Sequence, residues 1–231
     1  MDAQDAPRPR TGIERSRDRD GRRAHAKGML QGIVSMLPPG DVTVDCGANL
    51  GAITEVLADS GATVHAFEPE PFTFDILRKN FGDRPNVILH NVAVGVNAGK
   101  VTLMRAEGWA ANPQGTSESC SIIEGRRRMD TGDGIEVELI DFAFLTDLLS
   151  RHSRIALVTS DIESAELDPL EAMETHGFFD KVGLTVAETH EQKFAHLAPR
   201  FVALRTRITA RYPTRGSILT GSNGSALPQT E

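Results

Sequence analysis

A glycine-containing turn between a strand pattern and a helix pattern is the feature that most constrains the fold of this chain. Residues 42–44 form a short β-branched apolar run, and apolar side chains recur at helical spacing over residues 53–57. Between them lies the turn DCGANLG, residues 45–51. Its glycines, Gly47 and Gly51, allow the backbone to approach a ligand at the helix amino terminus, where free N–H groups favour an anion. The order strand, turn, helix predicts a nucleotide-type cofactor site.

The residues of this turn also bear on which cofactor binds. A dinucleotide site requires G-x-G-x-x-G, in which the second glycine makes room for the pyrophosphate, but here Asn49 and Ala52 stand at the second and third glycine positions. The turn therefore favours a ligand whose carboxylate and amine, and no phosphate, meet the backbone. S-adenosylmethionine is such a ligand. Glu68 ends the next strand, 17 residues after Gly51, where a carboxylate can accept both ribose hydroxyls.

Strand and helix patterns continue to alternate along the chain, which predicts an α/β fold with a mostly parallel central sheet covered by helices. Asp168 is expected to cap one helix, with Pro169 in its first turn. Residues 105–134 show no sustained period, and loops of this length are uncommon unless they are functional or mobile. Strands are expected at 42–44, 63–67, 86–89, 100–104, 136–139, 155–158 and 181–187, and helices at 53–57, 71–81, 142–149, from 168, and within 191–211.

Both ends of the chain have the composition of flexible tails. Residues 1–27 are polar and Arg-rich, whereas residues 213–231 are rich in Gly, Ser and Thr. Within the latter, Gly216 to Thr220 is the stretch that could supply a closing strand. The expected organisation is an amino-terminal arm, one catalytic domain over residues 28–212, and a carboxyl-terminal tail.

Charge and composition limit the classes of partner. The net charge is −7, but residues 1–28 carry eight Arg or Lys against five Asp or Glu, so the remainder has a net charge of −10. An acidic body argues against a nucleic-acid-binding core. Cys46 and Cys120 make neither a disulfide framework nor a four-cysteine metal site. The sequence shows no secretory leader and no run of about 20 apolar residues, so we expect a protein of the cytoplasm without a membrane span.

Three stretches of the chain resemble the FkbM family of S-adenosylmethionine-dependent methyltransferases. They are DCGANLG followed by FEPEP, the segment Asn91 to Gly95, and DIESAELDPLEAM over residues 161–173. The resemblance runs from about residue 40 to 190. It implies the class I methyltransferase fold, a Rossmann-like three-layer sandwich. It also implies O-methylation of a hydroxyl on a sugar, a glycan or a secondary metabolite, with S-adenosylmethionine as methyl donor.

The resemblance, carried over by position, implies which residues bind the cofactor. Residues of the glycine turn would meet the methionine part, Glu68 would hold the ribose, and the segment around Asn91 and Ala93 would line the adenine. The block Gly115 to Ser121 resembles the family's Ser-rich loop over the pocket. The implied cofactor-binding residues are Asp45, Gly47, Asn49, Gly51, Glu68, Pro69, Asn91, Ala93 and Asp161.

The same resemblance places Asp161, Glu163 and Glu166 beside the transferred methyl, with Glu188 and His190 closing the site from the next strand. The candidate catalytic bases are His190, Asp161 and Glu163. His190 ranks first, because imidazole has an unperturbed pKa of about 6.5, whereas a carboxylate is a weaker base unless burial raises its pKa. A histidine capping a strand end and carboxylates at a helix amino terminus are the structural alternatives. A magnesium site on the three carboxylates is disfavoured, because Asp161 and Glu163 point to opposite faces of a continuing strand.

Two positions depart from the family pattern: Thr159 stands where a Lys is usual, and Ser164 where a Gly is usual. Loss of the Lys removes a cation that could orient the carboxylates. One alternative is therefore a non-catalytic cofactor-binding or partner-binding protein. A nicotinamide-dependent oxidoreductase is another, disfavoured by the missing second glycine. Nucleic-acid N-methylation is disfavoured because residues 160–163 are not the Asn/Asp-Pro-Pro-aromatic turn that stacks a flipped base.

Overall fold

The computed structural model describes residues 11, 21, 24, 28–117, 120–123, 129–152, 154–163, 165–189, 196–212 and 217–221. The chain forms two compact units, Met1–Met36 and Leu37–Glu231. In the first unit, residues 28–34 are helical. The second unit contains every element discussed below. Within the described ranges, no helix has the length and apolar character needed to cross a bilayer.

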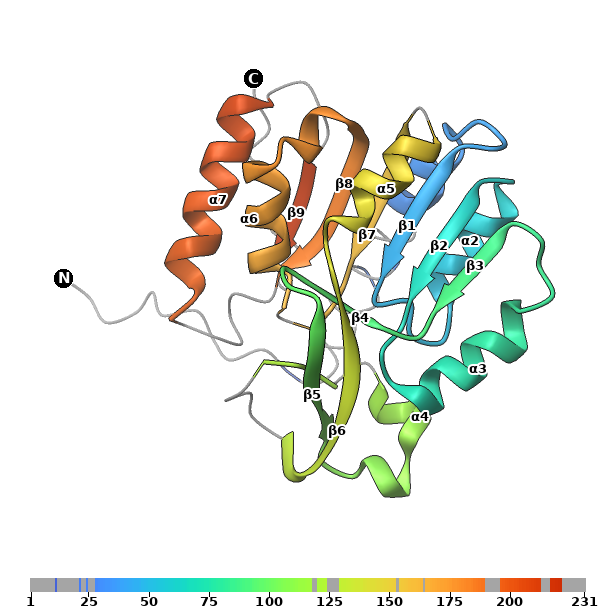
Figure 1. Ribbon diagram of the computed structural model, residues 1–231, viewed down its shortest axis with the longest axis vertical. Coiled ribbons are helices and arrows are strands. Elements are labelled where there is room, and N and C mark those ends of the chain that lie inside the picture. Colours follow the sequence, from blue (N-terminus) through green and yellow to red (C-terminus); the bar gives the residue numbers. More distant parts are fainter. Residues whose placement is uncertain are drawn as a thin grey trace. The chain divides into compact units, whose positions relative to one another are not determined.

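A six-stranded sheet forms the centre of the second unit (Figure 1), and every neighbouring pair in it is parallel. The strand order is β3-β2-β1-β7-β8-β9, so the chain proceeds outward in opposite directions from β1 and from β7. In open α/β sheets, ligands bind outside the carboxyl ends of the strands at such a switch point. The strands are β1 (Val42–Cys46), β2 (Thr63–Phe67), β3 (Val87–His90), β7 (Ile155–Ser160), β8 (Val182–Thr189) and β9 (Ser217–Gly221).

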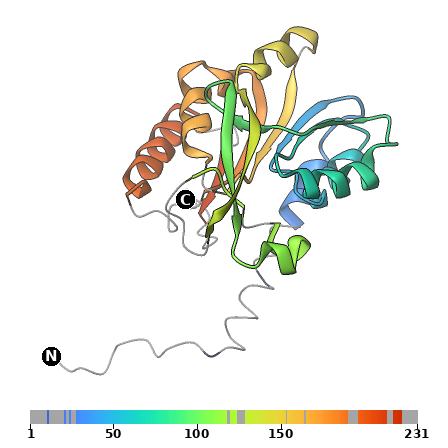
Figure 2. The same ribbon diagram turned by 60° about the horizontal axis from the view of Figure 1, so that its bottom comes forward.

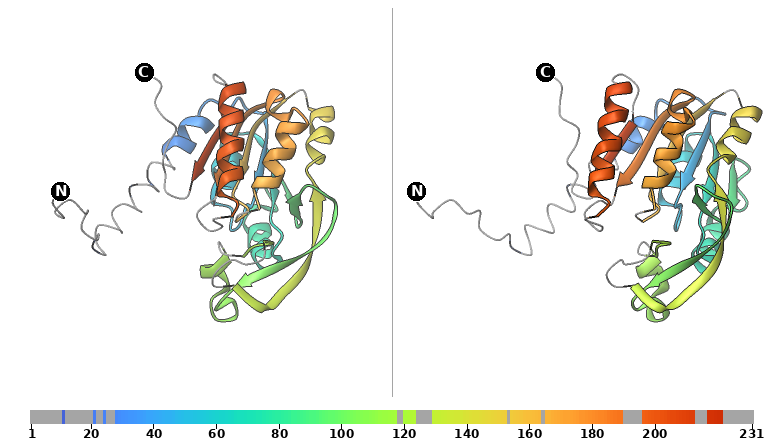
Figure 3. Two further views of the ribbon diagram at one scale, coloured as in Figure 1. Left: turned by 90° about the vertical axis from the view of Figure 1, so that its left-hand side faces the viewer. Right: turned by 60° about the vertical axis from the view of Figure 1, so that its left-hand side comes forward.

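Helices cover both faces of this sheet, which confirms the predicted α/β sandwich with a parallel centre. In Figures 1 and 3, α6 and α7 lie on the face opposite to α2. Side chains of β1 alternate between the faces: Val44 joins the apolar core with Leu145 and Leu204, whereas Asp45 accepts a hydrogen bond from Thr54 of α2. The helices are α2 (Ala52–Asp59), α3 (Pro71–Phe81), α5 (Phe144–Arg151), α6 (Leu167–Thr175) and α7 (Ala198–Arg211).

A second, three-stranded sheet is built from β4 (Ala93–Gly95), β6 (Met129–Asp141) and β5 (Gly99–Ala106), in that order. Strand β6 is parallel to β4 and antiparallel to β5. Figures 1 and 3 show β5 and β6 reaching past the carboxyl ends of the main strands. The short helices η1 (Trp109–Ala111) and α4 (Pro113–Thr116) follow β5, and Figure 2 shows α4 beside α3. This second sheet therefore projects toward the end of the main sheet where ligands are expected.

Three sequence expectations need correction or completion. Residues 105–134 are not irregular throughout, because β6 begins at Met129, which pairs with Ala106 of β5. Asp168 is not a helix cap: α6 begins at Leu167 with Glu166 at its N-cap. Residues 217–221, expected within the tail, form β9, which pairs with β8.

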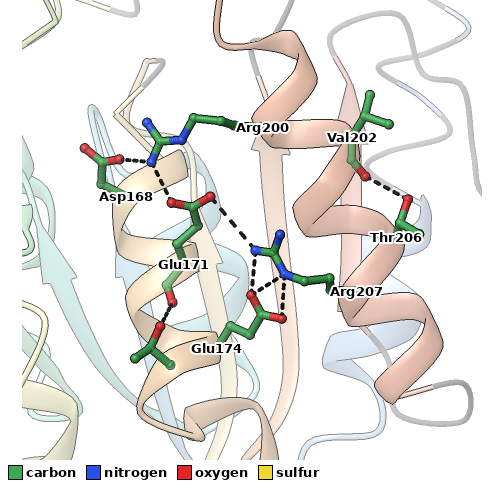
Figure 4. A network of polar contacts seen from close by, with 8 residues as sticks. Asp168, Glu171, Glu174, Arg200, Val202, Thr206 and Arg207 are labelled. Carbon is green, nitrogen blue, oxygen red and sulfur yellow. Dashed lines mark hydrogen bonds and ion pairs between the residues drawn. The ribbon is translucent and has the colours of Figure 1, made fainter.

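Helix α7 forms ion pairs with α6 on one side and packs into the apolar core on the other. Arg200 pairs with Asp168 at 2.8 Å and with Glu171 at 2.5 Å, and Arg207 pairs with Glu174 at 2.7 Å. Figure 4 draws these contacts between the two helices. The two arginines and Asp168 are about half exposed, whereas Glu171 and Glu174 are less so, and ion pairs in contact with water contribute little to stability. The opposite stripe of α7 is buried in the apolar core and consists of Phe201, Leu204 and Ile208. Apolar burial therefore dominates the docking of α7.

Leu204→Ala is expected to lower the free energy of unfolding by about 2–5 kcal/mol, because it leaves a cavity in a fully buried position. Val202→Ala on the same helix is the matched control, because that side chain is 55% exposed and its loss should change stability by about 0.5 kcal/mol or less. Urea unfolding followed by circular dichroism measures both. Equal losses in the two variants would contradict this assignment of the core.

Candidate functional site

The turn after β1 is shaped by two glycines in the left-handed region, with φ of +87° at Gly47 and +99° at Gly51. A β-carbon at Gly47 would overlap the backbone carbonyl of Asp161, and one at Gly51 would overlap the ring of Phe81. Both positions therefore need glycine because other parts of the protein approach closely. Asn49, between them, is also left-handed at φ +50°. The sequence correctly singled out these glycines, but it attributed the close approach to a ligand.

Glu68, directly after β2, joins the turn after β1 to the turn after β2. Its Oε2 accepts a hydrogen bond from the backbone N–H of Asn49 at 2.9 Å, and its Oε1 accepts one from the N–H of Glu70, also at 2.9 Å. Burial raises the pKa of the Glu68 carboxyl to about 7, although the two N–H bonds oppose this shift. A carboxylate oxygen can accept more than one hydrogen bond, so Glu68 keeps acceptor capacity for a ligand.

Asp45 lies beneath the turn, and its side chain is engaged within the protein. Its Oδ2 accepts from the Thr54 hydroxyl at 2.7 Å, and its Oδ1 accepts from the Thr159 hydroxyl at 2.9 Å. Burial raises the pKa of Asp45, while these hydroxyl bonds lower it. Thr159 stands where the family that the sequence resembles has Lys, and it supports Asp45 through a hydrogen bond from an uncharged hydroxyl. Contact of Asp45 with the methionine part stays a prediction.

Of the residues expected around the adenine, Asn91 follows β3 and contacts the segment after β2. The Asn91 side-chain amide donates to the backbone carbonyls of Glu68 at 2.8 Å and Pro69 at 3.1 Å. Ala93 is buried in β4. Asn91 therefore fixes the loop that presents Glu68, and the adenine role of these residues stays a prediction.

At the carboxyl end of β7, Asp161 and Glu163 are half-buried. The N–H of Asp161 donates to the carbonyl of Cys46 at 2.9 Å, which continues the pairing of β7 with β1. Glu166 is fully buried, and its carboxylate accepts from the N–H of Ile162 at 3.0 Å. Glu166 therefore braces the loop from within, and its expected place beside the methyl group stays a prediction. The described residues contain no group of three His, Cys, Asp or Glu side chains that could hold a metal.

Two residues named from the sequence cannot be placed. His190, ranked first as a base, and Ser164 lie outside the described residues. Thr189, the last residue of β8, is buried, and Glu188 before it is exposed. The ranking of His190 stays a prediction.

Residues 105–117 and 120–121, which we call the strap, contact the turns after β1, β2 and β7. The hydroxyl of Ser117 donates to the side-chain oxygen of Asn49 at 2.9 Å, and that of Ser121 donates to the carbonyl of Glu163 at 2.7 Å. The resemblance implied that residues 115–121 form a loop over the pocket, and this role stays a prediction. Arg105, which binds Glu70 at 2.7 Å, has no motif around it and was missed by sequence reasoning.

Gly47→Ala is expected to destabilise the fold more than Gly40→Ala, although both glycines have nearly the same φ, +87° and +86°. At Gly40 nothing lies within 4 Å of the added carbon, so the cost is the backbone conformation, about 1–2 kcal/mol. At Gly47 the Asp161 carbonyl must also move. Chemical unfolding of both variants measures the difference, and equal losses would refute the close approach.

Comparison with known proteins agrees with this geometry. The model of the methyltransferase FkbM domain matches residues 45–211, from Asp45 of the glycine turn to Arg211, the last residue of α7. The chain is 28% identical to 31-O-demethyl-FK506 methyltransferase FkbM of Streptomyces tacrolimicus over an alignment of 188 residues, and the match covers 67% of each chain. It is 34% identical over 80 residues to ribosomal RNA small subunit methyltransferase H of Novosphingobium aromaticivorans, covering 32% of this chain and 24% of that one.

Among solved structures, methyltransferase FkbM from Methylobacillus flagellatus KT matches with a TM-score of 0.45 and 14% identity. The match covers 82% of this chain and 43% of that one, so the chain spans less than half of the solved relative. The family model, by contrast, covers well over half of the present sequence and includes the turn, Glu68 and the β7 end. The chain therefore belongs to the FkbM family of methyltransferases.

Proposed function

We propose that this protein transfers a methyl group from S-adenosylmethionine to a hydroxyl of a sugar, a glycan or a secondary metabolite. The observation that carries the proposal is the position of Glu68. This buried carboxylate joins the turns after β1 and β2, and β1 is one of the two strands that flank the switch point of the sheet. The Glu68 oxygens retain acceptor capacity. The relative from Streptomyces tacrolimicus bears the name of an O-methyltransferase, which supports a hydroxyl acceptor.

The residues present fit the proposed cofactor. Four carboxylates, those of Asp45, Glu68, Asp161 and Glu163, lie at the carboxyl ends of β1, β2 and β7 or just beyond them. Negative groups suit a ligand that carries a sulfonium and an ammonium. The amino terminus of α2 supplies backbone N–H groups for the ligand's carboxylate. The carboxylates therefore suit the two positive groups of S-adenosylmethionine, and the backbone N–H groups suit its carboxylate.

When bound, S-adenosylmethionine supplies a methyl group that is already activated on a sulfonium. Glu68 would accept the ribose hydroxyls and so fix the long axis of the ligand. Asp161 and Glu163 would border the acceptor, beneath the strap. Holding the two reactants in line can supply about 7–11 kcal/mol of the barrier reduction.

An alcohol acceptor must lose its proton, so a base belongs in this site. We propose His190 in this role, because it directly follows Thr189 at the end of β8, the neighbour of β7. Asp161 and Glu163 are the other catalytic candidates. A positioned base contributes a factor of about 100 to 10,000 in rate.

Glu68→Gln is expected to weaken binding of S-adenosylhomocysteine by about 10-fold or more, because hydrogen bonds to a charged acceptor contribute about 1.5–3 kcal/mol. In the wild type, affinity should rise with pH through about 7, since the ionised carboxylate accepts both hydroxyls. The variant should lose this dependence. Calorimetric titration measures both, and exposed Glu136→Gln is the control. Unchanged affinity in Glu68→Gln would contradict the ribose assignment.

His190→Ala is expected to lower methyl transfer about 100- to 10,000-fold while leaving S-adenosylhomocysteine binding intact. The measurement is release of S-adenosylhomocysteine with a panel of glycans and hydroxylated metabolites. Full activity of the variant would remove His190 as the base, and Asp161→Asn and Glu163→Gln then test the carboxylates. Tight cofactor binding without turnover on any acceptor would favour the non-catalytic alternative, and methylation of ribosomal RNA alone would contradict the acceptor class.

A further inference from the structure

Arg105, the penultimate residue of β5 and the first of the strap, makes three contacts. Its Nη2 donates to Glu70 Oε1 at 2.7 Å, and its Nη1 donates to Asp133 Oδ1 at 3.2 Å. Its guanidinium also lies over the Trp109 ring, 5.1 Å from the ring centroid. The Arg105 side chain is 21% exposed and that of Glu70 only 2%, so this ion pair is largely withdrawn from water. Removing one partner of such a pair leaves an uncompensated buried charge.

Glu70 connects Arg105 to the cofactor site. Its second oxygen accepts from the N–H of Thr73 at 2.8 Å and so caps α3, while its own N–H donates to Glu68 Oε1. The carboxylate that binds Arg105 and the backbone group that binds Glu68 therefore belong to one residue. Glu70 thus links the Arg105 guanidinium to the donor that orients Glu68.

The electrostatics around Glu68 give Arg105 a second effect. The charged or titratable groups that face Glu68 are Glu70 at the start of α3, Asp45 of β1 and Cys120 of the strap. The two carboxylates disfavour ionisation of Glu68, and burial raises the thiol pKa of Cys120 to about 11, so the thiol is neutral. Among the ion pairs of the described residues, the one that reaches this group of carboxylates is made by Arg105.

We propose that Arg105 is a positioning residue for the cofactor pocket, which holds Glu70 and neutralises its charge so that ionised Glu68 can accept the ribose hydroxyls. This inference rests on the proposed function. Arg105 itself acts through Glu70 and need not touch the cofactor. Because the guanidinium uses two separate N–H groups and stacks on Trp109, Lys cannot reproduce the whole arrangement.

The test compares Arg105→Gln, Glu70→Gln and the double variant by calorimetric titration with S-adenosylhomocysteine from about pH 5 to 9. Arg105→Gln should bind about 10-fold more weakly at neutral pH, the effect of one charged hydrogen bond. Its affinity-versus-pH midpoint should move upward, because the unneutralised Glu70 opposes ionisation of Glu68. In the double variant no charge remains at position 70, so affinity and midpoint should return to near those of Glu70→Gln. The proposal would be overturned if the double variant bound S-adenosylhomocysteine as weakly as Arg105→Gln does, or if Arg105→Gln bound it as tightly as the wild type does.

Arg84→Gln is the matched control, because Arg84 also pairs with a carboxylate, Asp59 at 2.6 Å, and lies over a ring, that of Phe81. Its affinity and midpoint should equal those of the wild type. If Arg105→Gln does not fold, Arg105→Lys keeps the charge and should bind more weakly with an unmoved midpoint; a moved midpoint would overturn the proposal. Absence of binding by folded wild type would instead refute the proposed function.

Discussion

The rest of the site depends on the hydrogen bonds that the buried carboxylate of Glu68 accepts. A buried carboxylate is costly unless hydrogen-bond donors compensate for the lost water. Here the donors are two backbone N–H groups, of Asn49 and Glu70, which belong to the turns after two neighbouring strands. The same carboxylate therefore holds the turns together and presents acceptor oxygens at their junction. A ligand that binds Glu68 meets both turns at once.

The surrounding structure supports this carboxylate from three sides. Asn91 holds the backbone carbonyl of Glu68 from the end of β3, and the strap contacts the Asn49 side chain through Ser117. On the third side, Arg105 anchors Glu70 from the projecting second sheet. A segment without sequence periodicity thus becomes part of the site because it bridges the ends of strands that are distant in the chain.

Local patterns predicted the part of the fold that local sequence determines. The strand Thr63–Phe67 and the helix Pro71–Phe81 have the predicted bounds, because apolar periodicity and a first-turn proline specify them without distant partners. The start of β6 at Met129 was missed, because it depends on pairing with Ala106, more than 20 residues away. The hydrogen-bond partners of Asp45, which lie on other elements, could not be predicted from local sequence either. Glu68 was found because its position at a strand end is itself a sequence property.

A crystal structure of the complex with S-adenosylhomocysteine tests the central claim most directly. The account predicts both ribose hydroxyls within hydrogen-bonding distance of the Glu68 carboxylate, with the Asn49 and Glu70 N–H bonds to that carboxylate retained. It also predicts that the sulfur faces the end of β7, where Asp161 and Glu163 lie. A ribose bound elsewhere, with Glu68 still enclosed by the two turns and without ligand contact, would contradict it.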